Sequence, residues 1–227
     1  MWYKSLFVLM FFLLVSGGCT SGPPAAVKYS WELYRAPKVS GETFKGQSVA
    51  ILPPLSIEYQ PSQEIYRETL AGLLYTAMRA YPESPTIIAM DAVQGAVNRS
   101  ELWNDILQMY TEYHNSAVLR KDVLSKLGQA INARYVLLPK LLIYQQEVFD
   151  RATVLGVSFL RTRQSLVSVQ AQIWDTATGE VVWQGVGEGT DASEVVRGRP
   201  ASFASVARNA SESLASRMPW LKWSVEK

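Results

Sequence analysis

The residues that could carry acid–base or metal chemistry are few and lack companions in the sequence. His114 is the only histidine of the 227 residues, and it follows the segment YTEY near the end of a predicted helix. A metal site would need further ligands, and a Ser-His-Asp arrangement would need a stronger context. The carboxylates that could form acid–base pairs have no fixed separation: Glu58, Glu64, Glu68, Asp91 and Asp105. We therefore predict solvated surface groups, with no catalytic residue, no metal and no enzymatic activity.

The glycines of the segment GVGEG, Gly185 to Gly189, are dense enough to suggest a phosphate-binding loop. Such a loop must follow a strand and open a helix. These glycines instead lie in a predicted strand and precede an acidic turn. Glycine at every second position removes side chains from one face of a strand. We therefore predict that a final helix rich in Ala and Ser, from about Ala201 to Arg217, packs closely on this face.

Cys19 is the one remaining reactive side chain, and it follows an unbroken apolar run of ten residues, Leu6 to Val15. As a helix this run would span about 15 Å, roughly half of a ~30 Å hydrocarbon layer. Lys4 precedes the run, and the small residues Ser16, Gly17 and Gly18 separate it from the cysteine. This order is typical of an export signal and its cleavage site. The alternative is an ordinary signal peptide followed by a buried or free cysteine.

The segment VSGGC, Val15 to Cys19, resembles the bacterial lipoprotein signal, in which small residues precede an invariant cysteine. The resemblance implies cleavage before Cys19 and a diacylglyceryl group on its sulfur. More than one acyl chain anchors a protein stably. Thr20 and Ser21 follow the cysteine in place of aspartate. This resembles the pattern of lipoproteins sent to the outer membrane, so we expect attachment there, facing the periplasm. The covalent lipid is the only bound group expected.

The chain divides into four predicted parts. Residues 1–18 are the signal peptide, and residues 19–45 hold the lipidated cysteine, a flexible tether over Thr20–Ser30 and an N-terminal arm. Residues 46–217 form a single α/β domain, and residues 218–227 form an aromatic tail. Without Lys4, 21 of the 22 Lys and Arg face 20 Asp and Glu, a net charge of +1. So small a charge leaves no electrostatic footprint for nucleic acid.

Hydrophobic patterns predict an α/β (α+β) domain with a mixed sheet packed by helices. The predicted order is β-α-β-α-α-β-β-β-α. The first strand, Ser48–Leu52, stops at Pro53 and Pro54, and Pro139 in the long strand 134–149 suggests a bulge or an edge position. The remaining predicted elements are a helix from Ser62, a strand Thr86–Met90, helices following Asp91 and Ser100 and around Leu124–Ile131, and a hairpin that turns at Asp175–Glu180.

Four segments together carry a family resemblance: VAILPPL, the helix after it, KLGQAINARYVLLPKLL, and VSVQAQIWDTATGEVVWQGVGEG. The domain resembles that of the curli-secretion-channel lipoprotein family (CsgG-like), the amino-terminal domain of TolB, and the penicillin-binding-protein activator lipoproteins. The matching residues are Val49–Pro53, Leu127–Leu138, Asp175, Thr178, Gly179, Glu180 and Trp183. They are scaffold residues, so the resemblance implies a fold over about residues 46–217 and transfers no functional site.

Two apolar segments are candidate contact surfaces for partners. The tail carries Trp220 and Trp223, which suit a membrane interface or a protein contact. The alternative is that they fold back onto the domain. The segment FDRATVLGVSFLRTRQ, which includes Val154, Leu155 and Phe159, joins two predicted strands. It is either an exposed contact loop or simply a continuation of the two strands.

These observations predict a non-enzymatic lipoprotein that assembles, recruits or regulates other cell-envelope proteins. Its expected partners are the membrane, through the lipid on Cys19, other envelope proteins, and further copies of itself. The alternative is a subunit of an oligomeric outer-membrane export channel. The sequence contains no clear pair of long insertions with alternating lipid-facing residues, which counts against that alternative.

Overall fold

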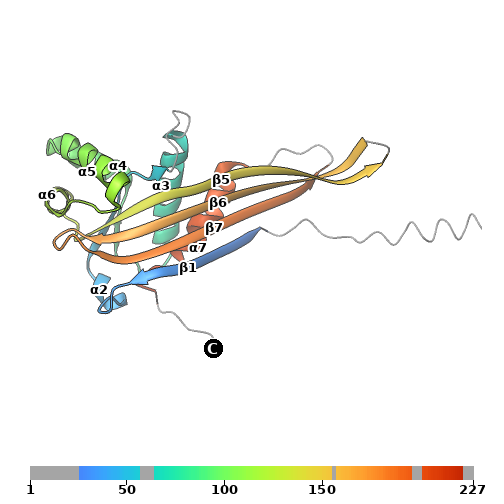
Figure 1. Ribbon diagram of the computed structural model, residues 1–227. Helices are drawn as coiled ribbons and strands as arrows, with labels where there is room; N and C mark the ends of the chain where they lie inside the picture. Colours follow the sequence, from blue (N-terminus) through green and yellow to red (C-terminus); the bar gives the residue numbers. More distant parts are fainter. Residues whose placement is uncertain (1–25, 57–63, 155–156, 196–200, 222–227) are drawn as a thin grey trace, which may run out of the picture.

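The computed structural model describes residues 26–56, 64–154, 157–195 and 201–221 (Figure 1). Within these residues a seven-stranded mixed sheet is packed by six helices, which confirms the predicted fold class. Along the chain the elements are β1 (Val27–Arg35), α2 (Gly41–Phe44), β2 (Ser48–Ile51), β3 (Leu55–Ser56), α3 (Glu64–Arg79), β4 (Thr86–Ile88), α4 (Met90–Arg99), α5 (Trp103–Ser116), α6 (Lys121–Ile131), β5 (Tyr135–Val154), β6 (Val157–Asp175), β7 (Val181–Val195) and α7 (Phe203–Ala215).

The order of strands across the sheet is β1-β7-β6-β5-β2-β4, with β3 beside β5. The neighbouring pairs β1–β7, β7–β6 and β6–β5 are antiparallel, whereas β2 runs parallel to both β5 and β4. Three helices connect β4 to β5, at the places predicted after Asp91, after Ser100 and around Leu124–Ile131, although the predicted order counted only two helices there. The structure also adds β1, α2 and β3, which the prediction lacked. No helix among the described residues has the length and hydropathy to cross a bilayer.

Helices cover both faces of the parallel part of the sheet. Val49 and Ile51 of β2 pack into one core with α3 and α7, and Ala50 and Leu52 pack into a second core with α4, α5 and α6. Because successive residues of a strand point to opposite faces, a strand covered on both sides must be apolar throughout. This explains the uninterrupted run VAIL that follows Ser48.

β1 occupies the segment that was predicted as the end of the tether and an unplaced arm. It pairs antiparallel with β7, with Val27 opposite Thr190 and Ser30 opposite Gly187. The prediction that the tether extends to Ser30 is therefore wrong, because Val27–Ser30 already belong to the sheet. The arm continues into α2, whose Phe44 is buried in the core beside Tyr135.

Pro139 lies in a central strand, not at an edge. β5 pairs with β2 as far as Leu137 and with β3 from Lys140 onward. Pro139 therefore falls between the two short partners, beyond the point where Pro53 ends the pairing of β2. A missing N–H costs least where the neighbouring strand is interrupted.

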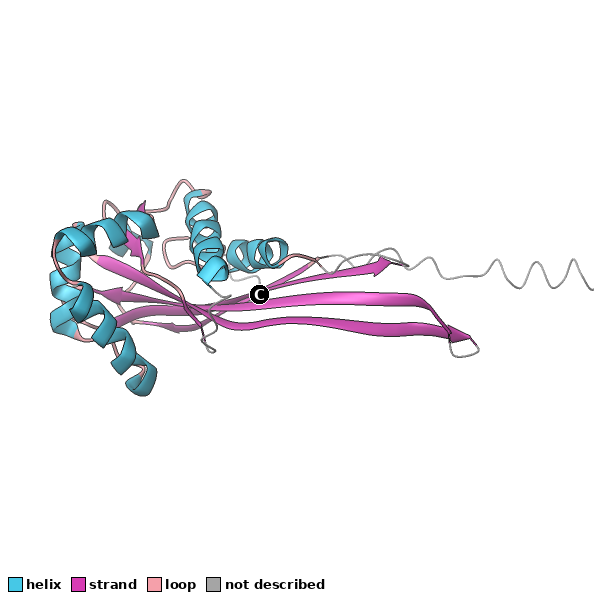
Figure 2. Cartoon of the chain, turned by 90° about the horizontal axis from the view of Figure 1, so that it is seen from above, coloured by secondary structure: helices cyan, strands magenta, loops and turns pink. Residues whose placement is uncertain are grey.

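β5 and β6 form one long hairpin, with Tyr135 opposite Asp175 at one end and Val154 opposite Val157 at the other. The segment predicted as either a loop or longer strands thus has a strand backbone. Figure 2 shows that the far part of the hairpin extends beyond the helices.

Gly187 and Gly189 of β7 receive α7, as predicted, whereas Gly185 faces the ring of Trp183. A Cβ built on Gly187 would lie 2.6 Å from Cβ of Leu214, and one on Gly189 would lie 2.6 Å from the backbone nitrogen of Ala210. Both positions are too tight for any side chain. The alternate glycines are therefore a packing surface, which confirms that they do not form a phosphate-binding loop.

Candidate functional site

The predicted contact residues divide between described and undescribed parts of the chain. Cys19, Leu155 and Trp223 lie outside the described residues. Val154 ends β5 and Phe159 lies near the start of β6, so their backbones belong to the far end of the hairpin. Lipidation of Cys19 and contacts through this hairpin remain predictions.

Trp220 is a core residue. Its side chain is 3% exposed, and its ring meets that of Phe44 edge-on, with 5.4 Å between the centroids. The prediction that Trp220 contacts a partner is therefore wrong, and the alternative, that this tryptophan folds back onto the domain, describes its position. The physical reason is the apolar space beside α2, which a large ring fills.

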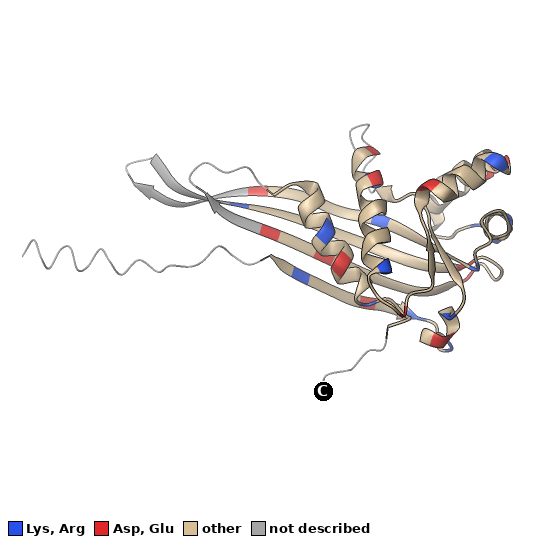
Figure 3. Cartoon of the chain, turned by 180° about the vertical axis from the view of Figure 1, so that it is seen from behind, with Lys and Arg blue, Asp and Glu red and all other residues tan. Residues whose placement is uncertain are grey.

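The histidine and the carboxylates are dispersed over the helices. His114 is exposed in the last turns of α5, Asp91 accepts a hydrogen bond from the N–H of Ala92 at 2.8 Å, and Asp105 forms an ion pair with Lys126 at 2.8 Å. Glu58 lies outside the described residues. Within the described ranges no group of three His, Cys, Asp or Glu side chains could hold a metal ion. In the view of Figure 3, Lys and Arg positions are interspersed with Asp and Glu positions along the described elements.

An apolar groove lies at the end of β2. From β2 the chain passes through α3 to β4 on one side, and returns through α4, α5 and α6 to β5 on the other side. β2 is thus the point at which the direction of winding reverses, where ligand sites of open α/β sheets commonly form. The groove has a volume of about 540 Å³, within the usual range for binding sites.

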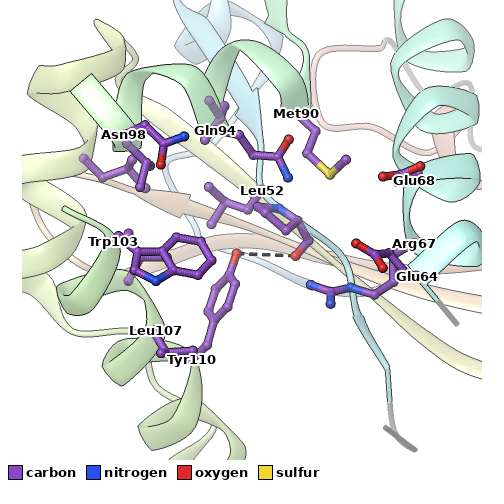
Figure 4. Close-up of a pocket in the computed structure, with 15 residues that line it drawn as sticks. Leu52, Glu64, Arg67, Glu68, Met90, Gln94, Asn98, Trp103, Leu107 and Tyr110 are labelled. Carbon is purple, nitrogen blue, oxygen red and sulfur yellow. Dashed lines mark hydrogen bonds between the residues drawn. The ribbon is translucent and has the colours of Figure 1, made fainter. Parts of the chain in front are cut away.

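The groove has an apolar floor and an aromatic wall (Figure 4). Leu52 and Val93 are buried in the floor, and Met90 contributes from the start of α4. Trp103 and Leu107 of α5, one helical turn apart, form a wall and are 59% and 53% exposed. Large apolar side chains that remain this exposed beside a concavity are typical of a binding surface.

Two side chains secure the polar backbone where β2 ends. The hydroxyl of Tyr110 donates to the carbonyl oxygen of Pro53 at 3.3 Å, and Nε of Arg67 donates to that of Pro54 at 2.7 Å. Burial raises the pKa of the Tyr110 phenol well above its ordinary value, and the nearby Arg67 opposes this in part. Tyr110 is therefore a neutral hydrogen-bond donor at physiological pH.

The rim of the groove is polar and acidic on the α3 side. Glu64 and Glu68, one turn apart, line it together with Arg67, and Gln94 and Asn98 face them from α4 (Figure 4). Neither glutamate forms an ion pair with another described residue. This groove can accept an apolar side chain on its floor and a cationic or hydrogen-bonding group at its rim.

The sequence prediction missed this groove. It placed a helix after Ser100 but gave no role to Trp103 and Leu107, which lie outside the buried stripe that the structure shows, Ile106, Met109 and Tyr113. These two stand at i and i+4 outside that stripe, and such a second apolar pair on a solvent-facing side was the available signal.

The hairpin turn that carries the family resemblance is structural. Asp175 accepts from the N–H groups of Ala177 and Thr178 at 2.8 and 3.1 Å and from Nη2 of Arg134 at 2.7 Å. Gly179 has a φ of +73°, which favours glycine. Trp183 is fully buried and donates to a carboxylate oxygen of Glu32 at 2.8 Å.

No family model and no curated protein matches the chain. Among solved structures, it is similar to the PelC dodecamer from Paraburkholderia phytofirmans, with 17% identity, a TM-score of 0.45, and coverage of 86% of this chain and 97% of that chain. Lipoprotein GNA1162 from Neisseria meningitidis has 17% identity, a TM-score of 0.42 and coverage of 65% and 84%. The LpoB C-terminal domain from Escherichia coli has 11% identity, a TM-score of 0.34 and coverage of 66% and 94%.

Proposed function

We propose that this chain is a lipid-anchored, periplasm-facing outer-membrane protein that assembles or regulates other envelope proteins without catalysing a reaction. The apolar groove carries the proposal. It combines an apolar floor, an exposed tryptophan and two carboxylates that form no ion pair with another described residue, which suit the binding of a segment of a partner protein. The groove residues supply no nucleophile paired with a base.

The occupant that fits the groove is an amphipathic segment of a partner protein. Its apolar side chains would cover Trp103 and Leu107, and a lysine or arginine beside them would face Glu64 and Glu68. Helices bind grooves in this way through anchors spaced three or four residues apart. The volume of about 540 Å³ limits the occupant to a few buried side chains, so the expected complex is one of modest affinity.

Attachment through Cys19 would keep the domain close to the bilayer. Only eight residue steps separate Cys19 from Val27, where β1 begins. Even a fully extended chain of that length spans at most about 29 Å. The partners would therefore be proteins at the membrane surface, and the far end of the β5–β6 hairpin, with Val154, Leu155 and Phe159, would offer a second contact.

The anchor is tested by fractionating cells that produce the wild type or the Cys19→Ala variant. We expect the wild type in the outer-membrane fraction, with a diacylglyceryl mass on its first residue, and the variant in the soluble periplasmic fraction. A variant that stayed with the membrane, or a wild type with an unmodified thiol, would rule out the anchor.

The groove is tested by photocrosslinking in the anchored protein. A photoreactive residue at Leu107 should yield a defined crosslinked partner, and adding Trp103→Lys should abolish that product. The matched control is a photoreactive residue at Val118, which is 56% exposed outside the groove and should not give the same product. Equal products from both positions would show that the groove is not the contact.

The export-channel alternative is favoured by one observation, the β5–β6 hairpin that extends beyond the helices (Figure 2). A channel subunit would form closed rings in detergent, visible by negative-stain microscopy. An assembly module would appear as a small oligomer under the same conditions.

A further inference from the structure

The outer edge of β1 is open to pairing with another strand. β1 ends the sheet, and no strand among the described residues pairs with its outer side (Figure 1). An open edge presents unpaired N–H and C=O groups that can pair with another chain. Tyr29 and Trp31 stand on the face of β1 opposite α7 and are 60% and 41% exposed.

The polar residues of β1 are held on the other face. Lys28, Ser30 and Glu32 lie opposite Gly189, Gly187 and Gly185, the glycines that receive α7 and Trp183. They make contacts within the chain: Lys28 with Glu212, Ser30 with Arg217, and Glu32 with Trp183. In β1 the usual arrangement, with apolar side chains toward the helix and polar side chains toward solvent, is therefore inverted. The aromatic side chains of β1 point away from the helix and add little to the core of their own chain.

The residues of β1 on the two sides of Ser30 are complementary in charge and in aromatic character. The segment is Val27-Lys28-Tyr29-Ser30-Trp31-Glu32-Leu33. We propose that β1 pairs antiparallel with β1 of a second copy, about a two-fold axis at Ser30. Lys28 then lies opposite Glu32 of the second copy, and Tyr29 lies opposite Trp31 of the second copy. The two-fold repeats each pair, as in any isologous interface.

The charges favour this register over the others with the same faces matched, because a two-fold centred on Tyr29 or Trp31 would leave Lys28 and Glu32 with no opposite charge facing them. A two-fold centred on Lys28 would oppose two lysines, and one centred on Glu32 would oppose two glutamates. Like charges directly opposite one another destabilise a sheet, whereas aromatic and opposite-charge pairs stabilise it. Centring on Ser30 gives both favourable pairs at once. β1 is regular from Val27 to Glu32, since its register shift falls between Glu32 and Tyr34.

The helices leave room for this arrangement. A two-fold perpendicular to the sheet puts α7 of both copies on the same face. With strands about 4.8 Å apart, α7 above β7 would lie about 14 Å from its counterpart, beyond the 8–10 Å of packed helices. On the opposite face, Tyr29 and Trp31 of the two copies would form one continuous aromatic row.

This inference does not depend on the groove or on the lipid. It is tested with the chain from residue 19 onward carrying Cys19→Ser, which contains no other cysteine. Adding Ser30→Cys puts two thiols directly opposite each other, at a Cα separation of about 5 Å that a disulfide can bridge. We expect a disulfide-linked dimer on mild oxidation, formed at least about tenfold faster than for Leu107→Cys, an exposed position on α5.

The register has its own test. A mixture of the Tyr29→Cys and Trp31→Cys chains should form mixed disulfides much faster than either chain alone, because residue 29 faces residue 31 of the other copy. Crosslinking of Ser30→Cys that is no faster than that of Leu107→Cys would overturn the proposal. So would a mixture that crosslinks no faster than its components.

Sedimentation analysis gives an independent measure. Trp31→Lys removes both of the Tyr29–Trp31 pairs that the two-fold axis produces. We therefore expect the affinity of the dimer to fall about tenfold or more. Trp103→Lys, which alters another exposed tryptophan, should leave it unchanged. A wild type that stays monomeric at several hundred micromolar, or a dimer lost only on changing Trp103, would contradict pairing through β1.

Discussion

The backbones of Gly187 in β7 and Ala210 in α7 are in direct contact. A Cβ on Gly187 would therefore press against the carbonyl oxygen of Ala210. Main-chain atoms cannot rotate away from an added methyl group. We therefore expect Gly187→Ala to lower the free energy of unfolding by about 2–3 kcal/mol, measured by urea denaturation. Gly72→Ala on α3 is the matched control, because a Cβ there would meet nothing within 4 Å. It should be neutral or stabilise by up to about 1 kcal/mol, and equal losses at both positions would refute the tight contact.

Asp175 should contribute to stability mainly through the turn it holds. Asp175→Ala leaves the N–H groups of Ala177 and Thr178 without their acceptor, so we expect a loss of about 2–3 kcal/mol. Asp175→Asn keeps an acceptor oxygen and should cost about half as much. Arg134→Ala should cost less than about 1 kcal/mol, since its side chain is 44% exposed and solvent screens the ion pair. Thermal or urea unfolding would measure these losses in the free energy of unfolding. Equal losses for Arg134→Ala and Asp175→Ala would show that Asp175 contributes through the ion pair and not through the turn.

Tyr110 should make the fold sensitive to alkali. Burial raises the pKa of its phenol in the folded chain above the unfolded value of about 10. The folded chain thus retains a proton that the unfolded chain releases. This contribution to stability is fully present below pH ~10 and decreases as the pH rises above it. Urea unfolding between pH 9 and 11 should show a shallower decline for Tyr110→Phe than for the wild type. Equal declines for Tyr110→Phe and the wild type would contradict this role of Tyr110.

Trp220 should behave as part of the core and not as an exposed contact. Trp220→Ala removes a buried ring packed on Phe44, so we expect a loss of about 3–5 kcal/mol in the free energy of unfolding. Trp103→Ala, at an exposed tryptophan, should change the same quantity by less than about 1 kcal/mol. Comparable unfolding midpoints for the two variants would place Trp220 outside the core.

The central strands and the helix faces were predictable because local pattern and tertiary environment agree there. The apolar run VAIL predicted a strand, and the structure covers both faces of that strand with helices. The pattern around Leu124–Ile131 predicted a helix, and its apolar residues lie on the buried side of α6. The glycines of β7 were predictable as a packing surface for the same reason, since their spacing matches one face of a strand.

β1 and the groove were not predictable by such reasoning. In β1 the apolar residues face solvent and the polar ones face α7. The usual rule, that the apolar residues of an alternating strand face the core, would therefore assign the wrong face of β1 to the interior. The groove exists only because α3, α4 and α5 meet beyond the end of β2. Whether these three helices come together depends on the order of the strands in the sheet. The hydrophobic periodicity of a single helix does not reveal that order.

The pairing of β1 with β7 joins the two ends of the domain, with Val27 opposite Thr190. Synthesis proceeds from the amino terminus, so β1 has no neighbouring strand until β7 has been made. A product cut short before Val181 would leave β1 with no partner strand. Completion of synthesis is therefore a condition for β1 to join the sheet, and truncated chains should be cleaved by proteases within this first segment.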